Sequence, residues 1–166
     1  MIDSTLVLKT EIAAGEEQEL LSVQKNKDVR TGIVDFDKAK VVGEDGGGSI
    51  AVDAIRVSHA AGVALDDPAA KSYTQTTFPA DLENAELQIS QGGRVVQKIK
   101  LAEFAFKGDE PQTRDDQWKT FSRPFVIAAG ADLKVKLLRP SGVAGAVAFL
   151  SVEFKGMQTY PKRSRA

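Results

Sequence analysis

Two side chains that often act as a catalytic base or nucleophile are nearly absent from this 166-residue chain, which has one histidine and no cysteine. The one histidine, His59, is the only imidazole on which a Ser-His-Asp triad could be built. Ser58 precedes it, but neighbouring side chains on a strand point to opposite faces, so the two are badly placed for proton transfer. We therefore interpret His59 as a surface or loop histidine, and not as a catalytic base.

Metal and cofactor chemistry is equally sparse. The chain has no cysteine, and a single histidine does not make a zinc site of ordinary composition. Paired carboxylates occur, and none follows the ligand order of a calcium loop. The pairs are Asp35 with Asp37, Asp66 with Asp67, and Asp115 with Asp116. Sequence leaves open whether any two carboxylates face each other across a cleft, as in a glycosidase. We interpret them as solvated loop residues, and we expect no enzyme, no cofactor and no metal site.

The glycine-rich stretch at residues 43–49 resembles a phosphate-binding loop only in composition. Such a loop is followed by a helix N-terminus, whereas here the next residues, Ile50 to Val57, have a strand pattern. Glu44 and Asp45 would also repel a phosphate. The stretch is therefore interpreted as a surface loop.

Binding chemistry is centred on a few aromatic and basic residues. Trp118 could stack against a sugar, or it could anchor a long loop to the body of the protein. Tyr73 and Phe78 are expected to hold down a second long loop. These three aromatic residues are the candidate interface or ligand anchors, together with a basic C-terminal group. That group is Lys162, Arg163 and Arg165.

The basic group forms a short tail, residues 161–166, which we expect to be flexible. One copy is too small for independent affinity for nucleic acid, because each phosphate contact adds only a modest, salt-sensitive contribution. Many copies in one assembly could bind by avidity. The formal net charge of −1 gives no electrostatic argument for nucleic-acid binding by the chain as a whole.

The elements that must carry these residues have the period-two pattern of strands. Leu133, Val135 and Leu137 alternate with lysines, and the run from Ala146 to Phe154 begins with both faces apolar and ends with one face polar. We expect these two runs to form an antiparallel pair. Other predicted strands are residues 6–12, 29–36, 50–57 and 125–127. The segment 13–25 is left open between a strand at 19–24 and a helix.

One tight hairpin and two long loops complete the pattern. Gly92-Gly93 supplies the turn of a hairpin over Glu86 to Leu101. The loops run from His59 to Ala80, with a helical turn near Pro68, and from Lys107 to Trp118. Counting gives about eight strands. The sequence therefore predicts an all-β fold, an antiparallel β-sandwich of jelly-roll type, as a single domain over residues 1–166.

The order of these elements resembles that of the single jelly-roll structural proteins of icosahedral viruses, phages in particular. The resemblance rests on the mid-chain strand at 50–57, the hairpin at 87–101, and the closing run at 149–160 with its basic end. It implies a capsid or capsid-associated subunit of a virion, assembled in the host cytoplasm and acting by self-assembly with other virion proteins. The alternative is a carbohydrate- or receptor-binding sandwich of a tail or cell-surface protein. No apolar run reaches the roughly 18 residues of a membrane span.

Overall fold

A computed structural model describes residues 2–12, 15–24, 27–30, 33–35, 49–63, 66–74, 78–104, 118–128, 133–140 and 148–158. Eight of its strands have six or more residues. They are β1 (Ile2–Ile12), β2 (Glu17–Gln24), β5 (Ile50–Ala61), β6 (Glu86–Gln91), β7 (Arg94–Lys100), β8 (Lys119–Ile127), β9 (Leu133–Leu138) and β10 (Ala148–Gln158). Two strands are shorter: β3 (Lys27–Arg30) and β4 (Ile33–Asp35).

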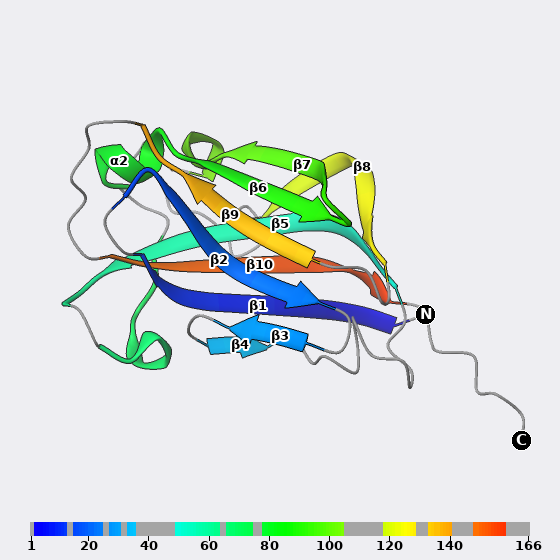
Figure 1. The fold of residues 1–166 in the computed structure, drawn as a ribbon, viewed down its shortest axis with the longest axis horizontal. Coiled ribbons are helices and arrows are strands. Elements are labelled where there is room, and N and C mark those ends of the chain that lie inside the picture. Colours follow the sequence, from blue (N-terminus) through cyan, green and yellow to red (C-terminus); the bar gives the residue numbers. More distant parts are fainter. Residues whose placement is uncertain are drawn as a thin grey trace, which may run out of the picture.

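The strands form two antiparallel sheets that face each other, as in a β-sandwich. Sheet A has the order β4-β1-β10-β5-β8, and sheet B has the order β3-β2-β9-β6-β7. The eight longer strands alone make four strands of each sheet, and β4 and β3 each extend one edge. Figure 1 shows β2, β9, β6 and β7 side by side, overlying β1, β10 and β5. The prediction of an all-β fold with about eight strands is confirmed.

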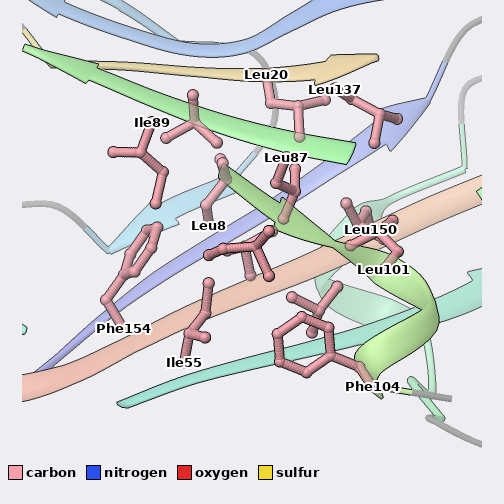
Figure 2. Close-up of a cluster of buried hydrophobic side chains, with 14 of the residues drawn as sticks. Leu8, Leu20, Ile55, Leu87, Ile89, Leu101, Phe104, Leu137, Leu150 and Phe154 are labelled. Atoms are coloured by element: carbon pink, nitrogen blue, oxygen red, sulfur yellow. The ribbon is translucent and has the colours of Figure 1, made fainter. Parts of the chain in front are cut away.

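The core lies between the sheets and is built from the inward half of each alternating pattern. In β9, Leu133, Val135 and Leu137 are buried while the lysines between them are partly exposed. In β1, Leu6 and Leu8 are buried in the same way. Figure 2 shows aliphatic and aromatic side chains from both sheets converging in this layer. Each fully buried leucine or isoleucine contributes about 1.5–3 kcal/mol, so this layer holds the sheets together.

The hairpin of β6 and β7 is confirmed. Gly92 and Gly93 have φ values of 54° and 77°, the left-handed conformation that two-residue hairpin turns require and that glycine adopts without strain. Gln91 pairs with Arg94 directly before and after the turn. A register shift between Ile89 and Ser90 adds a bulge near the turn.

Two predictions about the strands are wrong, one about a pairing and one about the extent of a strand. The runs around Leu133–Leu138 and Ala148–Gln158 do not pair: β9 is in sheet B, beside β2 and β6, and β10 is in sheet A, between β1 and β5. Both have an apolar face, and the pattern alone does not say that these faces oppose each other across the core. The single strand expected at 29–36 is two short strands, β3 in sheet B and β4 in sheet A, because the chain changes sheets between them. Phe36 lies outside the described residues.

β5 is longer than predicted, and this changes the position of His59. The strand continues to Ala61, and its register against both neighbours shifts between Val52 and Ala54. The strand thus has a bulge before Ala54, and after it Ile55, Val57 and His59 face the interior. His59 is 7% exposed. The interpretation of His59 as a surface or loop residue is wrong, because the strand carries it into the end of the core.

The remaining elements are short. Segment 13–25 contains strand β2, which resolves the choice between strand and helix for its described part. A helical turn, η1 (Pro68–Ala70), lies where a turn near Pro68 was predicted. The sequence pattern did not reveal α2 (Ala80–Glu83) or η2 (Leu101–Phe104), which close one end of the sandwich. Of the long loop from Lys107 to Trp118, the structure describes only Trp118.

Candidate interaction surfaces

Five groups of residues define the surface and the ends of the sandwich. They are the edge of β8, the edge of β7, the outer face of each sheet, and a polar cluster at the end that α2 closes.

The edge of β8 is closed by a side chain. Gln91 Nε2 donates to the carbonyl oxygen of Val126 (2.5 Å), and the backbone N–H of Ala128 donates to Gln91 Oε1 (2.9 Å). The carbonyl of one strand residue and the N–H two residues later point to the same edge, so one amide group pairs with both. Gln91 therefore occupies the position that a further strand would take. Exposed Pro124 in the same strand has no N–H to donate.

The edge of β7 has a different character. β7 is the last strand of sheet B, and among the described strands only β6 pairs with it. Val95 and Val96 are 47% and 39% exposed. Lys98 and Lys100 are exposed, whereas Ile99 between them is buried at 2%. Ile99 therefore faces the core, Lys98 and Lys100 face outward, and no described strand lies along the free edge.

The outer face of sheet B is polar and carries cross-strand ion pairs. Lys136 Nζ lies 2.5 Å from Glu17 Oε1, and Lys134 Nζ lies 3.6 Å from Glu19 Oε2. The hydrogen bond that Lys136 donates to Glu17 raises the pKa of Lys136. Both pairs are largely solvated, so they contribute little to stability. Their main effect is to balance charge on the β2 side of this face, away from β7.

Trp118 lies on the outer face of sheet A. The guanidinium carbon of Arg56 is 4.8 Å from the centroid of the Trp118 ring, and Lys155 Nζ is 5.7 Å from it. Arg56 is also paired with Glu153, its partner in register on β10. The ring is held by cation–π contacts to the sheet. Trp118 thus anchors the chain where it enters β8.

Tyr73 belongs to a segment, residues 62–74, whose described parts cover the other end of the same face. Its hydroxyl donates to the carbonyl of Pro68 (2.9 Å), and Lys9 Nζ lies 5.3 Å from its ring centroid. Burial raises the pKa of Tyr73 to about 12. Lys71 Nζ is 5.0 Å from the ring of Phe149, which faces outward yet is fully buried. The segment explains why β10 begins with both faces buried.

Within this segment, Asp66 receives two bonds. It is paired with Lys71 and accepts a hydrogen bond from the backbone N–H of Val63 (3.0 Å). These bonds, Lys71 first, lower the pKa of Asp66. Asp66 therefore has a local structural role in this turn, beyond that of a solvated loop residue.

Phe78 is in the core and not on the surface. It is 5% exposed, and its ring lies edge-on to His59 with centroids 4.8 Å apart. His59 also exchanges two backbone hydrogen bonds with Thr74. Phe78 thus holds the long connection against the sandwich, as expected, but its side chain is not presented to a partner.

His59 lies near a buried ion pair. Arg139 Nη1 is 3.5 Å from Asp81 Oδ2, and the side chains are 2% and 10% exposed. His59 Nδ1 is buried with no hydrogen-bond partner. Burial lowers the pKa of His59, although the Thr74 carbonyl and the Asp81 charge act in the opposite direction. Ser58 pairs in register with Ser151 on the outer face, so Ser58 and His59 do point to opposite sides.

Three candidate residues lie outside the described part of the chain: Lys162, Arg163 and Arg165. The described aromatic candidates are not brought together, since Tyr73, Phe78 and Trp118 each have separate contacts. Gln91, Arg56, Asp81 and Arg139 were missed. Of these four, only Arg139 could have been singled out from the sequence. It directly follows the apolar strand that ends at Leu138, and an arginine buried there would need a carboxylate partner.

Within the described ranges, no group of three or more histidine, aspartate or glutamate residues is placed to hold a metal ion. No helix in the same ranges is long and apolar enough to cross a membrane.

By its fold, the chain is an all-β protein of two antiparallel sheets. Comparison with protein-family models, with curated protein sequences and with solved structures finds no match.

Proposed function

We propose that this chain is a jelly-roll subunit of a virion, a capsid or capsid-associated protein that acts by self-assembly. The observation that carries the proposal is the connectivity of the eight longer strands. Numbered one to eight along the chain, they pair one with eight, two with seven, three with six, and four with five. This pairing supports a jelly roll, an architecture in which one long hairpin is rolled into two sheets.

Sheet membership gives the same connectivity. From β1 to β6 the longer strands alternate between sheets A and B, and from β7 to β10 they alternate in the reverse order. The order of sheet membership is therefore symmetric about the β6–β7 turn, as a rolled hairpin requires. Viral shells use this architecture repeatedly, and lectins and cupins use it as well. The proposal therefore also needs an argument from the surface.

The described surface favours a role in assembly over ligand binding. The interior is filled by aliphatic and aromatic side chains (Figure 2). The Trp118 ring, the sequence-based candidate for sugar stacking, already contacts Arg56 and Lys155. The free edge of β7 can pair with a segment of another virion protein, the kind of contact that a shell requires. The basic tail would add nucleic-acid contacts by avidity in such a shell.

The test is whether the purified chain assembles. Negative-stain electron microscopy and analytical ultracentrifugation across protein concentration and ionic strength should reveal closed particles or discrete oligomers. A chain that stays monomeric at high concentration under every condition, and does not associate with the other proteins of its native source, would contradict the proposal.

A further inference from the structure

The free edge of β7 is the described surface best suited to receive another protein segment. Five of its seven side chains are exposed, and its ladder is complete only on the β6 side. Those five are Arg94, Val95, Val96, Lys98 and Lys100. The edge therefore presents backbone groups without a described partner beside it, which is the template for strand addition.

The register of β7 sets the chemistry of an incoming strand. Lys98 and Lys100 pair with Gln88 and Glu86 on the outer face, and Ile99 faces the core between them. A strand laid beside β7 would place an apolar residue next to Ile99 and extend the core. The residues on either side would lie next to the lysines. Complementarity therefore requires acidic, apolar and acidic residues in alternation.

A second copy of β7 does not meet this requirement. Antiparallel pairing of two β7 strands about Gln97 would put Arg94 against Lys100 and Val96 against Lys98. Parallel pairing in register would put each cation beside itself. Like charges directly opposite in a ladder are destabilising. The cations that protect this edge from self-association thus select a partner of opposite charge.

We propose that β7 is a docking edge for an extended acidic segment of a partner protein, which adds to sheet B as a further strand. The inference goes beyond the proposed function and does not depend on it. A monomeric protein with this edge would bind such a segment equally well.

The test titrates the full chain with a seven-residue peptide, acetyl-Glu-Val-Glu-Val-Glu-Val-Glu-amide, which matches the length of β7. Binding is measured by isothermal titration calorimetry and mapped by amide chemical shifts. We expect the shifts to centre on β7, and the affinity to fall as salt is added. The peptide with lysine in place of glutamate should bind at least ~10-fold more weakly.

N-methylation separates strand addition from simple charge attraction. Backbone N–H groups of alternate residues point to opposite edges of a strand. One peptide methylated on the valine nitrogens and one methylated on the glutamate nitrogens keep the same charge. Strand addition predicts that one of the two loses binding while the other keeps it. Equal binding by both, or no binding at millimolar peptide, would overturn the proposal.

Variants of the chain give the reciprocal test. The double variant Lys98→Glu and Lys100→Glu should lose at least ~10-fold in affinity for the acidic peptide and gain affinity for the lysine peptide. The matched control is Lys155→Glu, which changes an exposed lysine on the other sheet. Circular dichroism and cooperative urea unfolding confirm that each variant folds. Unchanged affinity in the folded double variant would also overturn the proposal.

Discussion

β7 and β8 are edge strands, one in each sheet, and each is protected from unwanted strand pairing in a different way. At β8, the amide of Gln91 pairs with the backbone of Val126 and Ala128, so part of the edge is closed by a side chain. At β7, no described side chain closes the edge, and cations flank two exposed valines. An edge strand can thus be protected in two ways: a side chain can pair with its backbone groups, or charged side chains can flank it. Only the second leaves room for a partner.

The largest expected effect is a difference in unfolding free energy between two β7 variants, one at a buried side chain and one at an exposed side chain. Ile99→Ala should lower the free energy of unfolding by about 2–4 kcal/mol, because it leaves a cavity in the core. Val96→Ala, on an exposed side chain of the same strand, should change it by under about 0.5 kcal/mol. Urea unfolding followed by circular dichroism measures both. Similar losses in the two variants would mean that the β7 edge is covered.

The next largest effect is expected when the two hydrogen bonds between Gln91 and the β8 edge are removed. Gln91→Ala loses both hydrogen bonds and should cost about 1–2 kcal/mol, with faster hydrogen exchange at the Ala128 amide. The matched control is Gln88→Ala, since Gln88 donates only to Glu86 on a solvated face (2.9 Å). The control should change stability by under about 0.5 kcal/mol. If Ala128 exchange were unaffected in Gln91→Ala, the closure would have another origin.

The smallest effect is a pH dependence that should spare the β7 edge. Burial lowers the pKa of His59 below its ordinary value of 6.5, so the folded state favours the neutral ring. The stability that the neutral His59 ring contributes is fully present above the pKa of the unfolded chain. It is lost as pH falls from that value towards the lower pKa of the folded state. We expect unfolding free energy to decrease from pH 7.5 to 5.5, by less in His59→Gln.

Peptide affinity at β7 should stay constant over the same range, because neither β7 nor the peptide contains a histidine. An affinity that followed the stability profile would link the β7 edge to the His59 end of the sandwich. The groups facing His59 are the Asp81 carboxylate, paired with Arg139, and the backbone of Thr74.

Local signals in the sequence predicted much of this fold. Gly92-Gly93 predicted the hairpin because the turn needs positive φ at both residues, and alternation identified the buried faces of β1, β9 and β10. Local signals did not predict which sheet each strand joins. β9 and β10 are neighbours in sequence with similar patterns, yet they lie in opposite sheets, because β9 pairs with β2 and β6 while β10 pairs with β1 and β5.

The candidate sites were less predictable than the fold. The Gln91 amide acts on residues 35 and 37 positions away, and nothing near it in sequence signals that contact. His59 was misplaced because β5 continues past the residue at which its alternation became unclear. The aromatic residues were selected from the sequence as anchors, but sequence could not show that Phe78 points inward while Trp118 lies against Arg56.

Residue-resolved amide hydrogen exchange of the free chain tests the contrast between β7 and β8 most directly. The account predicts that alternate amides of β7, those facing away from β6, exchange nearly as fast as in an unstructured peptide, while the Ala128 amide is protected by Gln91. Protection of those outward β7 amides to the level of Ala128 would contradict it, since the edge would then already be occupied.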